Sequence, residues 1–121
     1  MWFRPSPKMP SHVLLGLIEN HRITATPRLG VRDESHPKGY RPDQEVTLRA
    51  FDEQGKEMLT KRARIVAIRS KQLQDLVSDD LDRSDMCSLD WESVRQKFSF
   101  FEARPLPAQE LISIVEFTYI T

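Results

Sequence analysis

The chain has 121 residues, with 18 Lys and Arg balanced by 18 Asp and Glu, and its formal net charge is zero. This length suits one domain with its own hydrophobic core, so we expect a single domain over residues 1–121. A neutral chain has no net charge with which to attract a polyanion, and this excludes nucleic-acid binding that depends on net charge alone.

Cysteine and histidine are too few and too scattered for a disulfide or a metal site. Cys87 is the one cysteine, and the histidines stand at positions 12, 21 and 36. We therefore expect no metal and no cofactor, and we interpret Cys87 as a small, semi-buried residue. No apolar run is long enough to cross a bilayer, and the N-terminus lacks the order of a signal peptide, so we expect a cytoplasmic protein without a membrane partner. The sequence does not decide the oligomeric state, for which we expect a monomer.

The first residues predict a short strand followed by a helix. The strand falls on Trp2–Pro5, and the helix begins only after Pro10 because prolines interrupt both elements. Ser11 is placed to accept a backbone N–H as the N-cap of a helix over residues 11–20. The apolar positions at helical spacing are Val13, Leu14, Leu17 and Ile18.

The segment 22–28 holds the polar side chains best suited to a ligand. Thr24, Thr26 and Arg28 alternate with apolar residues, so a strand would place them on one face. Together with Arg22 they offer hydroxyl and guanidinium groups, which suit a base edge, a phosphate or a carboxylate. A half-buried strand with a solvated polar face explains the same pattern equally well.

A loop and a hairpin follow. Residues 28–44 contain glycine, proline and charged residues without periodicity, and this long loop could fold over whatever the preceding strand binds. Residues 45–51 alternate, and the turn at residues 52–55 leads into an antiparallel strand over 57–69.

In the strand over residues 57–69 we expect one buried face at the start and two buried faces towards the end. The inward residues should be Leu59, Ala63, Ile65 and Ala67. Arg62 and Arg64 should project outward until Val66 and Ile68 bury the other face as well. Burial that changes in this way belongs in a curled sheet or barrel partly covered by helices.

The last part of the sequence, from residue 70 on, predicts two helices and a closing strand. Residues 70–77 suit a short helix, and residues 111–120 form a strand that is apolar on both faces. A longer helix near residues 89–98 carries an apolar stripe, which we interpret as core: Trp91, Val94, Phe98 and Phe101. The chain is thus predicted to be α+β, mainly β: one curled β-barrel with the helices at 11–20 and 89–98 outside it.

Charges are segregated along the chain. Residues 61–71 contain five cations and no acid, whereas residues 79–92 are strongly acidic. The acidic segment is most simply a solvated surface. A protein-interaction module that uses this segment is a further interpretation, and it rests on charge alone.

The layout resembles the ASCH domains of the PUA-like superfold over most of the chain. Those domains have a short first strand, a helix and then a motif of the form G-x-K-x-x-T-x-R. Here the motif falls on residues 21–28, where Thr26 and Arg28 match the Thr and Arg. His21 replaces the Gly, and Ile23 replaces the Lys.

The resemblance implies a PUA-like barrel that holds RNA or one modified nucleoside in a cleft beside the strand at 22–28. Arginines suit phosphates and base edges, threonines suit a base, and the basic strand would guide the RNA backbone. The ligand-binding residues that we expect are Arg22, Thr24, Thr26, Arg28, Arg62 and Arg64.

The resemblance also implies an alternative, because Arg32–His36 is similar to a segment of small bacterial members that hydrolyse N4-acetylcytidine. In those enzymes the motif Thr is the nucleophile, the Lys is the base and a downstream Glu is the proton donor, so Thr26 would be catalytic. Threonine needs an adjacent base, and Ile23 cannot act as one. The aspartates of the downstream region, such as Asp82 and Asp85, do not align securely with that Glu. We therefore favour binding over hydrolysis.

Overall fold

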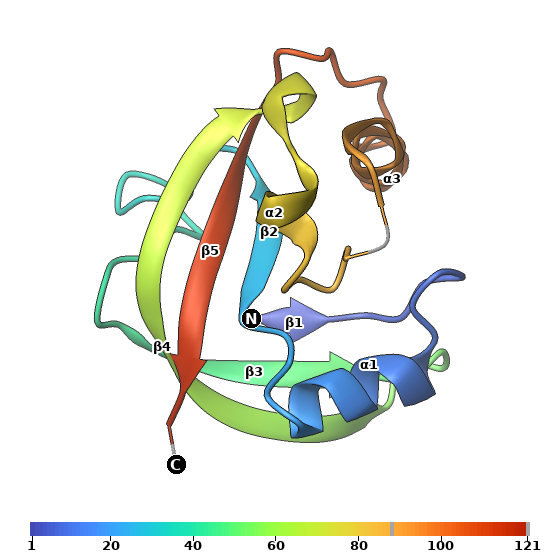
Figure 1. Ribbon diagram of the computed structural model, residues 1–121, viewed down its shortest axis with the longest axis vertical. Coiled ribbons are helices and arrows are strands. Elements are labelled where there is room, and N and C mark those ends of the chain that lie inside the picture. Colours follow the sequence, from blue (N-terminus) through green and yellow to red (C-terminus); the bar gives the residue numbers. More distant parts are fainter. Residues whose placement is uncertain (88, 121) are drawn as a thin grey trace.

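The structure is a computed structural model that describes residues 1–87 and 89–120, and it is built around one curled five-stranded sheet (Figure 1). The strand order is β1-β3-β4-β5-β2. The strands are β1 (Trp2–Phe3), β2 (Ala25–Leu29), β3 (Glu45–Phe51), β4 (Glu57–Gln72) and β5 (Leu111–Tyr119). The helices are α1 (Ser11–Glu19), the 3-10 turn η1 (Leu73–Asp75), α2 (Ser78–Leu81) and α3 (Trp91–Glu102).

The sheet curls into a half-barrel because β4 is long and strongly bent (Figure 1). Neighbouring strands are antiparallel except for β1 and β3, which run parallel. The two edge strands, β1 and β2, approach each other, and a hydrogen bond of 2.9 Å from Arg28 Nη2 to the Trp2 carbonyl joins them. The predicted α+β, mainly β, curled barrel is confirmed.

β5 is buried on both faces, as its sequence predicted. Val115 and Phe117 face one apolar cluster, and Ile112 and Ile114 face the other. Successive residues of a strand point to opposite sides, so the two clusters lie on opposite sides of the sheet. We call the side of the first cluster, which contains Val115 and Phe117, the inner side and the other the outer side. α1 packs Leu14 and Ile18 into the inner cluster, so this helix covers the inner side of the sheet and does not lie outside it as expected. The outer cluster is covered by η1, α2 and α3 with the segments between them.

The burial of Val66 is a wrong prediction, since its side chain is 55% exposed. The pairing of β4 with β5 shifts between Ile65 and Ala67, so one extra residue is inserted there. Such a bulge resets the alternation of a strand. Ile68, opposite Val115, therefore resumes the inward face that Ala67 was expected to continue.

The helices differ from the predictions in two boundaries and in the burial of one apolar stripe. Ser11 is the first residue of α1 and not its N-cap, because its N–H and hydroxyl both donate to the Glu53 carboxylate at 2.8 and 2.6 Å. Residues 70–72 continue β4, and only a 3-10 turn follows where a helix was expected. In α3, Val94 is buried but Phe101 is 61% exposed, so the apolar stripe is core only in its first part.

Candidate functional site

The inner face of β2 carries a hydrogen bond between two residues that are far apart in the sequence. The Thr26 hydroxyl donates to Oδ1 of Asp85 at 2.9 Å. Thr26 has no exposed surface, whereas Asp85 is partly exposed. Asp82 and Asp85 were named from the sequence only as aspartates that do not align securely with the proton-donor Glu of the family; in the structure the Asp85 carboxylate is the one within hydrogen-bond distance of Thr26.

Asp85 reaches Thr26 because the segment 83–86 runs alongside the free edge of β2. The Arg83 carbonyl accepts the N–H groups of Thr24 and Ala25 at 2.8 and 3.1 Å, and Ala25 forms a parallel bridge with Ser84. Ser84 is buried, donates to the Leu81 carbonyl at 2.8 Å and accepts the Met86 N–H at 2.9 Å. These bonds hold the segment in one conformation beside the strand.

Arg28 lies on the same face of β2 as Thr26, two residues further along. Its guanidinium carbon is 5.4 Å from the centre of the Phe3 ring, a cation–π contact, and its Nη2 donates to the Trp2 carbonyl. Its Nε is buried and has no hydrogen-bond partner among the described residues. Arg28 thus closes the gap between the sheet edges while one of its donors remains unused.

The loop after β2 brings a second guanidinium close to Arg28. Arg32 donates from Nε to the Leu29 carbonyl at 2.6 Å, and its backbone N–H donates to the Ser113 hydroxyl at 2.9 Å. Burial lowers the pKa of Arg32 and the positive charge of Arg28 lowers it further, while Tyr40 and Glu102 oppose the change. The start of the loop is therefore held against the end of β2 and against β5, close to Arg28.

Neither Arg28 nor Asp85 takes part in an ion pair among the described residues. A cation and an anion that share one face without neutralising each other remain available to a ligand with both donors and acceptors. Within residues 1–87 and 89–120, no group of three or more His, Cys, Asp or Glu side chains is placed to hold a metal ion.

The structure separates Arg22 and Thr24 from Thr26 and Arg28. Arg22 and Thr24 line a hollow of about 440 Å³ together with His21, Arg83, Cys87 and neighbouring residues. Cys87 is exposed there, contrary to the semi-buried position expected from its type.

Arg62 and Arg64 lie on the opposite face of the sheet from Thr26. Both bind Glu45 of β3, and the Arg64 bond is 3.2 Å long. Their neighbours Ala63 and Ile65 point into the inner cluster, so the two arginines must point outward. They cannot contact one small ligand together with Thr26 and Arg28, although an RNA strand could reach both faces.

Part of the acidic segment is structural. Asp80 is buried and binds Arg69 at 3.0 Å and Lys71 at 2.6 Å, and it accepts the Val77 N–H at 3.0 Å. Burial alone would raise the pKa of Asp80, but the hydrogen bonds from Lys71, Val77 and Arg69 outweigh it and lower the pKa. The interpretation of residues 79–92 as a solvated surface is therefore wrong at Asp80; Ser88 in that segment lies outside the described residues.

Comparison with known proteins assigns this fold. A crystal structure of an ASCH domain from Lactobacillus crispatus JV V101 superposes with a TM-score of 0.62 at 14% identity, covering 89% of this chain and 70% of that one. The chain has the fold of an ASCH domain. Protein EF3133 from Enterococcus faecalis V583, described by the family model DUF984, gives a TM-score of 0.67 at 14% identity and covers 97% of this chain and 78% of that one.

A third similar structure is the hypothetical protein PH0355, with a TM-score of 0.51, 15% identity and coverage of 98% of both chains. No family model and no curated protein matches the sequence itself.

Among the described residues, no helix combines the length and hydropathy that a membrane crossing requires.

Two residues that the resemblance aligned with motif positions lie next to Tyr119, the last residue of β5. Ile23, aligned with the motif Lys, is buried in the inner cluster, and its carbonyl accepts the Tyr119 hydroxyl at 2.5 Å. His21, at the Gly position, has a positive φ of 55° and stacks on Tyr119 with the ring centres 4.1 Å apart. A positive φ is what glycine permits most easily, and the resemblance aligned His21 with a glycine.

Proposed function

We propose that this domain binds a nucleoside, free or within RNA, on the inner face of the half-barrel, where Asp85 and Arg28 read the base. The observation that supports this most directly is the pair of unneutralised charges beside Thr26. Asp85 accepts one hydrogen bond, from Thr26, and has lone pairs left over, while Arg28 keeps an unused donor in Nε.

The donor and acceptor pattern suits the Watson–Crick edge of cytosine. That edge presents an exocyclic N4–H donor beside the N3 and O2 acceptors. Asp85 would accept from N4–H, and Arg28 would donate to an acceptor of the same base. An N4-acetyl group leaves one N4–H in place, so a modified cytidine satisfies the same pattern.

Thr26 acts in this proposal by fixing the carboxylate of Asp85. Its hydroxyl is enclosed, and direct contact with a base requires the segment 83–86 to move away from β2. A buried hydroxyl that donates to a carboxylate restricts the rotamers of that carboxylate, and a fixed acceptor binds a ligand with less loss of entropy. The sequence-based expectation that Thr26 contacts the base directly would apply only after such a movement.

The test is calorimetric titration of the protein with cytidine, N4-acetylcytidine and uridine. Uridine presents an acceptor at position 4 and should bind worst, because it faces the carboxylate of Asp85 with a second acceptor. Asp85→Asn, which offers an amide N–H to that acceptor, should reduce the preference for cytidine. The control Thr118→Ala changes an exposed residue of the outer face and should leave all three affinities unchanged. Equal binding of the three nucleosides would disprove the base-reading role.

One observation favours hydrolysis of N4-acetylcytidine as a second candidate function: the Thr26–Asp85 hydrogen bond itself. Asp85 could take the hydroxyl proton while Thr26 Oγ1 attacks the acetyl carbonyl and cytidine leaves with a proton; water would then release acetate from the threonine ester. The enclosure of Thr26 and the apolar Ile23 both weigh against it. Chromatographic detection of cytidine released from N4-acetylcytidine, with Thr26→Ala as the blank, tests this candidate.

A further inference from the structure

The outer face of the sheet carries an aromatic cluster at the edge strand β1. The rings of Trp2 and Phe51 have their centres 5.1 Å apart and are tilted by 57°. The guanidinium carbon of Arg4 lies 5.3 Å from the Trp2 ring and 5.4 Å from the Phe51 ring. The three side chains therefore form one cluster, with the Arg4 guanidinium beside both rings.

Trp2 is largely exposed to solvent, although its ring packs against Phe51 and Arg4. Phe3, the other residue of β1, is 1% exposed in the inner core, whereas Trp2 is 52% exposed. An isolated exposed tryptophan needs no explanation, but this one is held in place by a second ring and a guanidinium while half of its surface remains exposed. Such a surface is suited to stacking, because every nucleobase has a π-face.

Arginines extend from this cluster across the outer face. Trp2 is in register with Arg49 of β3, and residues in register point to the same side. Next along the sheet, Thr47 faces Arg62 and Glu45 faces Arg64. The outer surface as we define it comprises Trp2, Arg4, Arg49, Phe51, Arg62 and Arg64.

Cations are in excess on this outer surface. Arg49 is 3.5 Å from Glu57, and Arg62 and Arg64 share the single carboxylate of Glu45. Arg4 belongs to no ion pair among the described residues. Four guanidiniums thus face two glutamates, and the surplus charge is positive.

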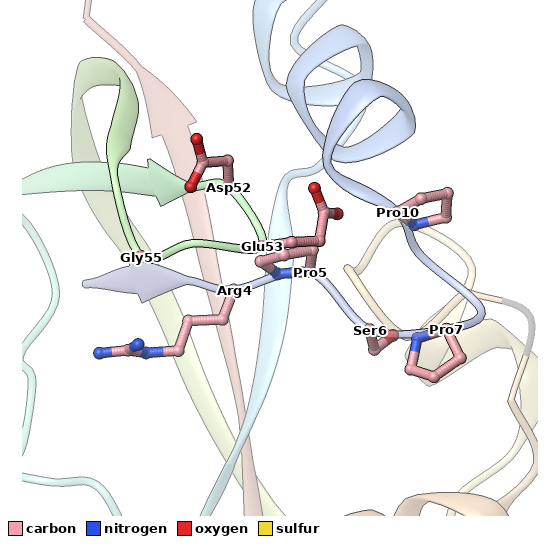
Figure 2. Close-up of a pocket in the computed structure, with 8 residues that line it drawn as sticks. All are labelled: Arg4, Pro5, Ser6, Pro7, Pro10, Asp52, Glu53 and Gly55. Atoms are coloured by element: carbon pink, nitrogen blue, oxygen red, sulfur yellow. The ribbon is translucent and has the colours of Figure 1, made fainter.

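Two nearby carboxylates do not cancel Arg4. Asp52 accepts the N–H groups of Gln54 and Lys56 in the hairpin turn, and Glu53 is held by Ser11 at the start of α1. Figure 2 shows the Arg4 guanidinium pointing away from both of them. An open hollow of about 490 Å³ lies beside Arg4, walled by the prolines at positions 5, 7 and 10 and by the turn with Asp52 and Glu53.

We propose that this outer surface binds single-stranded RNA, with Trp2 stacking on a base and the surplus arginines contacting flanking phosphates. The proposal rests on the proposed function and extends it, because β1 joins the two sites: Trp2 projects outward, while its carbonyl holds Arg28 on the inner side. An RNA strand passing over this edge would place one base on the inner face and the next bases on the outer surface. Stacking with arginine contacts is sequence-tolerant, so the outer surface would add affinity and the inner site selectivity.

The test uses Trp2 as its own reporter. The chain has two tryptophans, so Trp91→Phe leaves Trp2 as the only one. Titration of this variant with a ten-nucleotide oligocytidine should quench its fluorescence, whereas cytidine, which occupies only the inner site, should not. In the otherwise unchanged chain, Trp2→Ala should weaken RNA binding about five- to 150-fold and leave cytidine binding unchanged. Trp2→Phe, which keeps an aromatic ring, should recover part of the loss and shows that the fold tolerates the change.

Phe101→Ala is the matched control, since Phe101 is an exposed aromatic residue outside this surface and should have no effect on RNA binding. Trp2 fluorescence that ignores RNA, or Trp2→Ala that binds RNA as the wild type does, would overturn the inference. Retained cytidine binding in that case would leave the proposed inner site standing. Quenching that follows protein concentration and not RNA would identify a second copy of the chain as the occupant and would also overturn it.

Discussion

Thr26 and Asp85, 59 residues apart in the sequence, are joined by a hydrogen bond of 2.9 Å that connects an edge strand to the segment beside it. Thr26 is enclosed and Asp85 is partly exposed, so the threonine controls the orientation of a carboxylate that solvent and ligands can reach. The relationship explains why a threonine, rather than an aliphatic residue of similar size, occupies a position with no exposed surface.

Removal of the Thr26 hydroxyl should weaken ligand binding without abolishing the fold. In the binding proposal, Thr26→Ala should reduce affinity for cytidine or RNA by the worth of one hydrogen bond, about 0.5–1.5 kcal/mol. Thr26→Ser keeps the donor and should bind nearly as the wild type does. Calorimetry measures both, and equal weakening in the two variants would show that the methyl group, not the hydroxyl, matters.

Asp80 should make the free energy of unfolding depend on pH in the acidic range. Its pKa is lowered in the folded protein, so its ion pairs contribute fully above the ordinary aspartate pKa of about 3.9 and are lost as the pH falls through the lowered value. Asp80→Asn should destabilise the protein at pH 7 by about 1–3 kcal/mol and flatten the loss of stability below pH 4. Urea unfolding at several pH values measures this. Asp79→Asn, at an exposed neighbour, should behave as the wild type.

Local pattern was enough to predict most elements of the fold. The alternation in residues 45–51 and the turn after them gave the bounds of β3 and the hairpin, because both are determined by neighbouring residues. The bulge near Val66 was missed because it depends on how β4 must bend to pair with β5. An inserted residue leaves no mark in a run of apolar side chains.

The site was harder to predict than the fold. Thr26 and Arg28 were placed on one face correctly, since that follows from the period of a strand. The choice of Asp85 over Asp82 required the parallel bridge between Ala25 and Ser84, a pairing that no local pattern encodes. Which face Arg62 occupies relative to Thr26 likewise depends on the strand order of the whole sheet.

Arg62 and Arg64 should contribute to the salt dependence of RNA binding. For single-stranded RNA, each phosphate that the protein no longer neutralises should reduce the slope of log affinity against log salt by roughly 0.7. The double variant Arg62→Ala with Arg64→Ala should therefore flatten the slope by up to about 1.4. Arg104→Ala removes another exposed arginine, one paired with Glu110, and should not change it. Binding that does not depend on salt would exclude β4 as a strand that binds phosphates.

Tyr119 should resist ionisation. Burial raises its pKa to about 12, and its hydroxyl donates to the Ile23 carbonyl. The unfolded chain loses this proton near pH 10, so the stabilisation is complete below pH 10 and is lost as the pH rises towards 12. Tyr119→Phe should cost about 0.5–1.5 kcal/mol at pH 7 and should lose less stability than the wild type between pH 10 and 12. Chemical unfolding at these pH values measures the difference.

Substitution of Ile23 can distinguish between the two candidate functions. Its side chain is buried in the inner cluster together with Val115, the residue opposite Thr26 across the β2–β5 pair. A lysine at this position would lie on the same side of the sheet as the Thr26 hydroxyl. The buried amine would have a lowered pKa, which makes it a useful base near neutral pH.

We expect the wild type to release little or no cytidine from N4-acetylcytidine, and Ile23→Lys to release more. The variant should also be less stable, because a lysine amine buried in the apolar inner cluster loses its hydration. Ile23→Met, which has similar length and no amine, separates the effect of the base from that of the altered core. Released cytidine should be measured by chromatography, and the fold of each variant should be checked by circular dichroism. Efficient turnover by the unaltered chain would reverse our ordering of the two functions and would identify Asp85 as a sufficient base, since it is the carboxylate bonded to Thr26.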